Sequence, residues 1–185
     1  VYRHYVHHRP LELTEGLPWL RSIWRKQVFK WQERGIQASL ASSLSRQYFL
    51  VALQVHNDAQ IHVHSDYESV EAFVKSVVAS FAAHAPADTH LVIKHHPMDR
   101  GYHDHSRLIR ELAARHGVAG RVRYLHDQHL PTLLEHARGV VLVNSTVGLS
   151  ALDHDRPLKV CGVALFDIPG LTYQGSLDAF WHDAG

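Results

Sequence analysis

The chain of 185 residues is predicted to form an α/β domain, a Rossmann-like parallel sheet with helices on both faces. Apolar runs of strand length alternate with segments of helical periodicity from residue 48 onward, and the loops between them are short. Apolar residues make up 45% of the chain and charged residues 20%, which excludes a disordered or fibrous protein. A chain of this length can bury about 70% of its surface in one core.

The elements follow one another in strict alternation. We expect strands at Tyr48–Val55, His90–Lys94, Val122–Leu125, Gly139–Val143 and Leu158–Val160. We expect helices at Ser69–His84, His105–His116, Leu130–Ala137 and Val147–Leu152. Strands joined through helices in this way pair in parallel.

The first part of the chain, residues 1–47, is expected to contain a polar linker and a basic amphipathic helix, followed by the sheet domain over residues 48–185. Pro18 opens the helix, which runs to Arg34 and stops at Gly35. Two interpretations of this helix remain open. Its basic, tryptophan-bearing surface can lie on an anionic membrane, or its apolar stripe can pack on the domain or on a partner domain. With Val1 at its start, the chain is expected to be part of a longer, two-domain protein.

Composition excludes several functional classes. A formal net charge of +1 provides no general attraction for nucleic acid. Cys161 is the only cysteine, which excludes a disulfide framework and fits a cytosolic protein. The glycines form neither a dinucleotide fingerprint, nor a P-loop, nor a nucleophile elbow.

The end of the first strand carries a carboxylate that could be catalytic. The segment Gln54-Val55-His56-Asn57-Asp58 follows the apolar run, and Asp58 beside an amide could act as nucleophile or base. The alternative is an aspartate that only forms a turn.

The ends of two further strands suit a phosphate group. In Lys94-His95-His96-Pro97, the proline favours an extended His96, whose imidazole could neutralise a phosphate together with the Lys94 ammonium. Asn144-Ser145-Thr146 offers hydroxyl groups before a helix start, and Gly148 would allow close approach of the backbone. The alternatives are surface polarity and a simple helix cap.

Because the carboxyl ends of parallel strands meet at one edge of a sheet, these three segments are expected to form one site. A carboxylate beside a place for a phosphate leaving group is what glycosyl transfer from a nucleotide sugar requires.

Two other functions remain open. His62 and His64 would lie on one side of an extended segment and, with Asp66 and His95, could bind zinc in a hydrolase. The domain could also bind a nucleotide or sugar without catalysis. A nucleotide-sugar 2-epimerase is less favoured, because no paired glutamates follow the Asn144–Thr146 turn.

At these residues the sequence resembles the capsule polysaccharide biosynthesis family, the KpsS- and KpsC-type β-Kdo transferases of Gram-negative bacteria. The matching segments are Leu53–Ile61, His64–Tyr67, Lys94–Gly101, Asn144–Leu152 and Pro169–Thr172. The Gln54–Asp58 segment favours the KpsS type over the KpsC type.

The resemblance implies the nucleotide-binding half of a GT-B glycosyltransferase that transfers β-Kdo from CMP-Kdo with retention. Asp58 would then be the nucleophile and Gln54 its neighbour. The donor phosphate would be bound by Lys94, His96, Pro97, Asn144, Ser145, Thr146 and Gly148, and the substrates would be contacted by His56, Asn57, His64 and His95.

The resemblance also implies partners and a location. No metal cofactor is expected, because CMP carries a single phosphate. The acceptor would be a lysophospholipid of the phosphatidylglycerol type, on which a poly-Kdo linker is built. The protein would be cytoplasmic, peripheral to the inner membrane, and in contact with other capsule assembly proteins.

Overall fold

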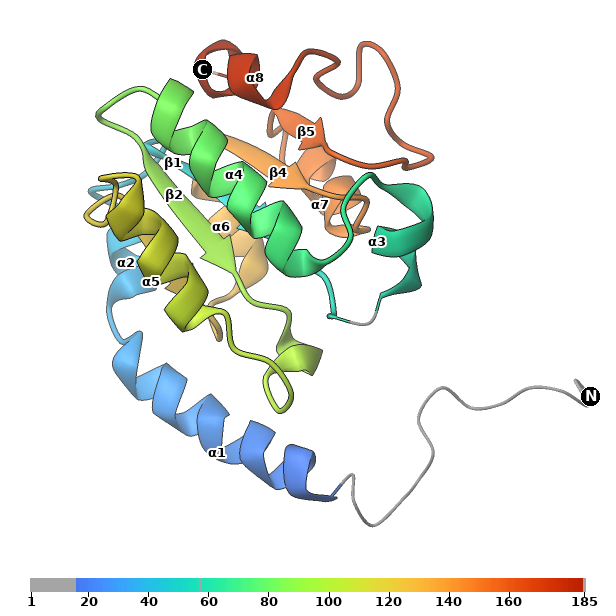
Figure 1. Ribbon diagram of the computed structural model, residues 1–185. Helices are drawn as coiled ribbons and strands as arrows, with labels where there is room; N and C mark the ends of the chain where they lie inside the picture. Colours follow the sequence, from blue (N-terminus) through green and yellow to red (C-terminus); the bar gives the residue numbers. More distant parts are fainter. Residues whose placement is uncertain (1–15, 57, 185) are drawn as a thin grey trace, which may run out of the picture.

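A parallel sheet of five strands forms the centre of the computed structural model, which describes residues 16–56 and 58–184 (Figure 1). The strands lie in the order β3-β2-β1-β4-β5 and all of them pair in parallel, which confirms the predicted fold class. Their bounds are β1 Tyr48–Ala52, β2 His90–Lys94, β3 Val122–Leu125, β4 Gly139–Leu142 and β5 Leu158–Val160.

Helices cover both faces of this sheet (Figure 1). The helices α4, α5 and α8 pack on one face, and α2, α6 and α7 pack on the other. The helices are α1 Gly16–Gln32, α2 Ile36–Leu40, α3 Ala59–His64, α4 Val70–His84, α5 Ser106–Arg115, α6 Leu130–His136, α7 Val147–Asp153 and α8 Leu177–Asp183, with a short 3-10 helix, η2, at Pro97–Asp99.

Alternation along the central strand divides the core in two. Phe49 and Val51 of β1 face α4 and α8, where Trp181 packs edge-on against Phe49 with ring centroids 5.0 Å apart. Tyr48 and Leu50 face the opposite side, and the Tyr48 hydroxyl donates to a carbonyl of α6 at 2.6 Å. Every residue of β1 is buried because neighbouring strands and helices cover it on all sides, as parallel sheets require.

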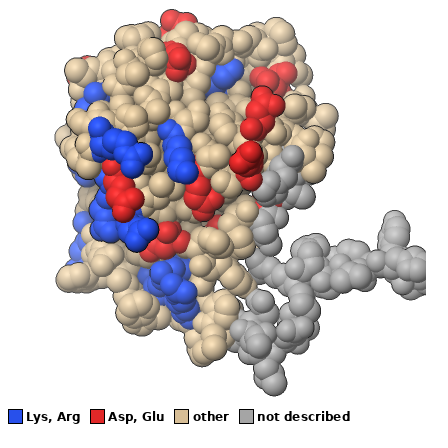
Figure 2. Space-filling model, viewed as in Figure 1, with Lys and Arg blue, Asp and Glu red and all other residues tan. Residues whose placement is uncertain are grey.

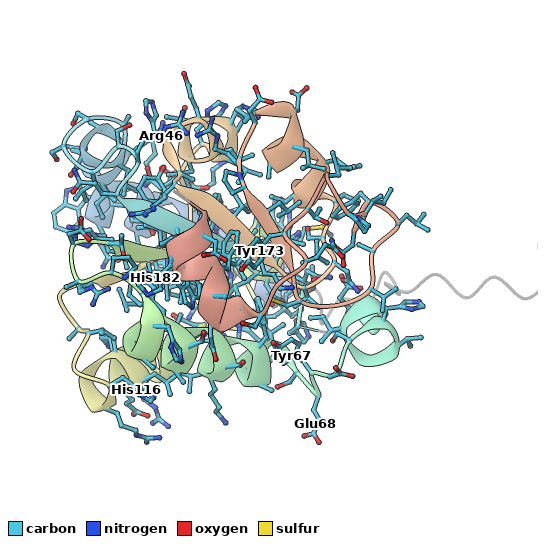
Figure 3. The ribbon with its side chains drawn as sticks, turned by 90° about the horizontal axis from the view of Figure 1, so that it is seen from above. Arg46, Tyr67, Glu68, His116, Tyr173 and His182 are labelled. Carbon is cyan, nitrogen blue, oxygen red and sulfur yellow. The ribbon has the colours of Figure 1, made fainter. Side chains whose placement is uncertain are left out.

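The segment after β5 packs on the part of the core that contains Phe49 and Trp181. Tyr173, labelled in Figure 3, lies beside α8 and packs against Phe180 with ring centroids 5.3 Å apart. The Trp181 indole donates to Ser80 of α4 at 2.8 Å, so α8 is tied to α4 by both packing and a hydrogen bond. The sequence pattern did not predict α8, which has only seven residues.

Two further local predictions are wrong. The segment that includes His62 and His64 is helical, as α3, rather than extended, and β1 ends at Ala52 rather than at Val55.

The order of the strands creates the position for a site. The chain continues from β1 to β2 on one side, while β4 pairs with β1 on the other side. The connections therefore diverge between the carboxyl ends of β1 and β4, which is where open α/β sheets bind ligands. Among the described residues, no helix is both long enough and apolar enough to cross a membrane.

Candidate functional site

Gln54 joins the ends of β1 and β4 at this divergence. Its side-chain amide donates to the Asn144 side chain at 2.9 Å, and its carbonyl oxygen accepts from the Asn144 backbone N–H at 3.3 Å. The same amide nitrogen also donates to Asp58 at 3.0 Å. Because Gln54 is buried, these bonds fix two loops against each other.

A small cavity of about 210 Å³ opens beside this amide. Three segments line it: Gln54, Val55 and Asp58 after β1, His96 after β2, and Asn144, Ser145 and Thr146 after β4. The structure therefore brings together all three segments that the sequence placed at one edge of the sheet. Apart from Val55, every residue that lines it is polar, so the cavity can receive a small anionic group.

His96 presents a neutral imidazole to the cavity. Its backbone is extended (φ −75°, ψ 126°), as predicted for a residue before proline, and its Nδ1 accepts the Met98 N–H at 3.3 Å. Burial lowers the pKa of His96, assisted by the Lys94 charge and opposed by Asp99 and Asp58. With Nδ1 accepting, the neutral ring carries its proton on Nε2, which is a donor for a bound anion.

The hydroxyl side of the cavity lies at the start of α7. Ser145 Oγ accepts the Val147 N–H at 3.3 Å, which orients the hydroxyl, and Thr146 is the residue before the helix. Since α7 has only seven residues, the hydroxyl groups and the imidazole, rather than the helix dipole, are the main binding groups.

Asp58 stands immediately before α3. Its carboxylate accepts the Gln54 amide, and its carbonyl accepts the Ile61 N–H at 3.1 Å. The position suits the turn that the sequence left open as an alternative, and it also places the carboxylate in the wall of the cavity.

Lys94 lies away from this cavity, which differs from its predicted place. Alternation along β2 places its side chain on the same face as Val92, where Nζ donates to the His126 carbonyl at 3.3 Å. Burial lowers the pKa of Lys94, while Asp127 and Glu33 oppose that shift. The ammonium contributes to the cavity only through its charge.

His95 is likewise enclosed in the interior. Its Nδ1 pairs with the Tyr124 hydroxyl at 2.6 Å, and its ring lies 5.1 Å from that of His126. Burial, with the nearby His126 and His105, lowers the pKa of His95 to about 3, so its ring is neutral at neutral pH. His95 is only 2% exposed and does not line the cavity, so the structure adds no support to its predicted contact with a substrate, which stays a prediction.

Asp99 holds the loop beside the cavity, and the sequence analysis did not name it as a candidate site residue. It is buried and bonds His56 twice, through the imidazole and through the backbone N–H at 2.9 Å. The His56 ring also contacts the His103 ring in a tilted arrangement, with ring centroids 3.9 Å apart. His56 thus connects the loop after β1 to the segment after His96. The position of Asp99, three residues after His96, is the sequence feature that could have pointed to its role. Asn57 lies outside the described residues.

Three other predicted site residues, Gly148, Pro97 and His64, make contacts within the protein itself. A Cβ on Gly148 would meet the Phe166 ring at 2.5 Å, so this glycine provides room for a side chain rather than for a ligand. Pro97 begins η2. The His64 carbonyl accepts the Asn144 amide at 3.4 Å, and His64 lines a second, mainly apolar cavity of about 700 Å³ that shares Asn144 and Thr146 with the first.

The structure describes two of the histidines named for a zinc site. His95 is only 2% exposed, and His64 lies at the end of α3 rather than on an extended segment. The side chain of His62 is outside the described part of the chain. Over residues 16–56 and 58–184, no three His, Cys, Asp or Glu side chains are placed to hold a metal ion.

Comparisons with known proteins agree with this architecture. Residues 1–185 match the family described as capsule polysaccharide biosynthesis protein. The capsule polysaccharide export protein KpsS of Escherichia coli is 47% identical over an alignment 185 positions long, which covers 97% of this chain and 48% of that protein. The capsule polysaccharide modification protein LipB of Neisseria meningitidis serogroup A is 44% identical over 183 residues. The match covers 98% of this chain and 44% of LipB. The chain thus spans about half the length of these relatives.

A solved structure has the same fold. The Thermosulfurimonas dismutans KpsC, a β-Kdo 2,7 transferase, superposes with a TM-score of 0.51 at 20% identity, over 84% of this chain and 50% of the KpsC chain. At this identity the similarity establishes the arrangement of the sheet and its helices.

Proposed function

The chain belongs to the capsule polysaccharide biosynthesis protein family, and on that premise we propose that it is the donor-binding part of a retaining β-Kdo transferase that uses CMP-Kdo. Its relatives are about twice its length, so the second, acceptor-side domain of a GT-B enzyme would come from the rest of the protein. The cavity at the sheet divergence carries the proposal, because it combines phosphate-binding donors with a carboxylate.

The polar cavity offers hydrogen-bond donors for the donor phosphate. The imidazole N–H of His96 and the hydroxyls of Ser145 and Thr146 would bind its oxygens, and the amide of Asn144 borders them. These donors also stabilise the charge that develops when CMP departs. We expect one phosphate bound in this way to need no metal ion.

The reaction would proceed in two displacements. The Asp58 carboxylate attacks the anomeric carbon, and the bond from that carbon to the phosphate oxygen breaks with its electron pair passing to CMP. An acceptor hydroxyl then attacks the same carbon, its proton passes to solvent, and the Asp58 carboxylate is released. Two inversions retain the β configuration. The Gln54 amide, bonded to Asp58 at 3.0 Å, orients the carboxylate for the first attack.

The acceptor completes the proposal. We expect a lysophospholipid of the phosphatidylglycerol type at the cytoplasmic face of the inner membrane, with other capsule assembly proteins nearby. The names of the relatives, which refer to capsule polysaccharide export and modification, support this setting.

Calorimetry of the full-length protein with CMP tests the phosphate site. Each hydrogen bond to a charged phosphate contributes about 1.5–3 kcal/mol, so His96→Ala and Ser145→Ala should each weaken CMP binding about tenfold or more. His116→Ala is the control, because His116 is exposed at the end of α5 (Figure 3). Unchanged affinity in both site variants would remove the phosphate from this cavity.

A further inference from the structure

The helix α1 displays an apolar surface to solvent. In Figure 1 it runs along the lower edge of the molecule, below α5 and the segment that follows β2. Its large apolar side chains are 45–74% exposed, namely Leu17, Trp19, Leu20, Ile23, Trp24 and Trp31. Three exposed indoles on one helix of 17 residues are a feature that the sheet and its cavity do not explain.

The opposite side of α1 is firmly attached. Arg25 donates to the Arg100 carbonyl at 2.9 Å and lies 3.5 Å from the Asp104 carboxylate. Phe29 stacks face to face on His126 with centroids 3.6 Å apart. Just beyond the helix, the buried Glu33 accepts the His126 backbone N–H at 2.7 Å. The apolar side is therefore exposed because the helix is held by its other side.

The charges on α1 are of one sign. The helix contains no Asp or Glu, and its exposed cations are Arg21, Lys26 and Lys30. At about 100° per residue, Arg21 borders the apolar side on one flank and Lys26 borders it on the other, while Lys30 lies between the directions of Trp19 and Ile23. Figure 2 shows blue side chains among uncharged atoms at this lower edge.

We propose that the outer face of α1 docks on an anionic lipid bilayer. Indole rings and aliphatic side chains enter the boundary of headgroups and acyl chains, while flanking lysines and arginines bind lipid phosphates. A protein partner is less favoured, because protein interfaces are depleted of lysine whereas this face includes Lys30 and is bordered by Lys26.

Docking in this way would bring the bilayer close to the site. The Pro18 carbonyl is so close to Gly101 that a Cβ there would lie 2.4 Å from it, and Arg25 holds residues 100 and 104. That segment follows His96 directly. A lipid acceptor would thus meet the protein beside the phosphate cavity, a consequence that rests on the proposed function, whereas the docking itself does not.

Sedimentation of the full-length protein with vesicles tests the docking. We expect binding to vesicles that contain 30% phosphatidylglycerol and at least tenfold weaker binding to phosphatidylcholine alone. Replacing Lys26 and Lys30 by Gln should weaken binding to the anionic vesicles about tenfold or more. Replacing Trp19, Trp24 and Trp31 by Ser should also reduce it at least tenfold.

Matched controls separate this surface from general charge and from the transferase site. Lys75→Gln with Arg110→Gln removes two exposed cations from α4 and α5 and should leave vesicle binding unchanged, as should His96→Ala. Equal binding of the α1 variants and the unmodified protein would overturn the proposal. So would tryptophan variants that change the oligomeric mass while vesicle binding persists, since α1 would then be a protein interface.

Discussion

Asp58→Asn is expected to reduce Kdo transfer by the full-length protein at least about 10³-fold, because asparagine cannot form the glycosyl ester of the first displacement. The variant keeps an oxygen that can accept the Gln54 amide, so the cavity should keep its shape. Affinity for CMP should therefore stay within about threefold. Transfer is measured from CMP-Kdo to a lysophospholipid acceptor, and CMP binding is measured by calorimetry.

Asp66→Asn is the matched control, because Asp66 is an exposed carboxylate a short distance along the same segment. It should transfer at the normal rate. Normal turnover by Asp58→Asn would exclude Asp58 as the nucleophile, and CMP binding without any transfer by the unmodified full-length protein would favour a non-catalytic binding domain.

Glu33→Ala is expected to lower the free energy of unfolding by about 3 kcal/mol or more. The Glu33 carboxylate accepts four hydrogen bonds: from the His126 backbone and ring at 2.7 and 2.9 Å, from the Asp127 backbone at 3.1 Å, and from Gln128 at 2.9 Å. Burial alone would raise the pKa of Glu33, but these donors hold it below its usual value. Removing the carboxylate leaves buried donors unpaired.

Urea unfolding measures this effect. Glu68→Ala, at an exposed glutamate labelled in Figure 3, should change the free energy of unfolding by less than about 0.5 kcal/mol. A loss of under 1 kcal/mol in Glu33→Ala would show that the carboxylate does not hold α1 and the loop after β3 together.

Strong hydrophobic patterns predicted most of the sheet. The bounds of β2, β3 and β5 agree with the sequence prediction. Ser69, where the predicted helix begins, caps α4 through its side chain. Where burial and local propensity agree, the sequence determines the element.

The failures have a common physical cause. The pattern His62-Val63-His64 alternates as a strand would, yet a helix of six residues forms there, held at its start by the loop that Gln54 and Asp58 fix. Tertiary contacts decide such short segments, and periodicity cannot.

The sequence pattern also could not predict where individual side chains point. His96 lines the cavity, whereas Lys94 and His95 are buried elsewhere. Lys94 lies on the same face of β2 as Val92 and bonds the His126 carbonyl, and His95 bonds the Tyr124 hydroxyl. The strand ends could be predicted from the sequence, but not which side chains meet there.

A crystal structure of the full-length protein with CMP tests the central claim most directly. We predict that the phosphate lies in the cavity between β1 and β4, bonded by His96 Nε2 and by the hydroxyls of Ser145 and Thr146, with the Asp58 carboxylate on the sugar side. A phosphate bound elsewhere, with this cavity filled only by water, would contradict the account.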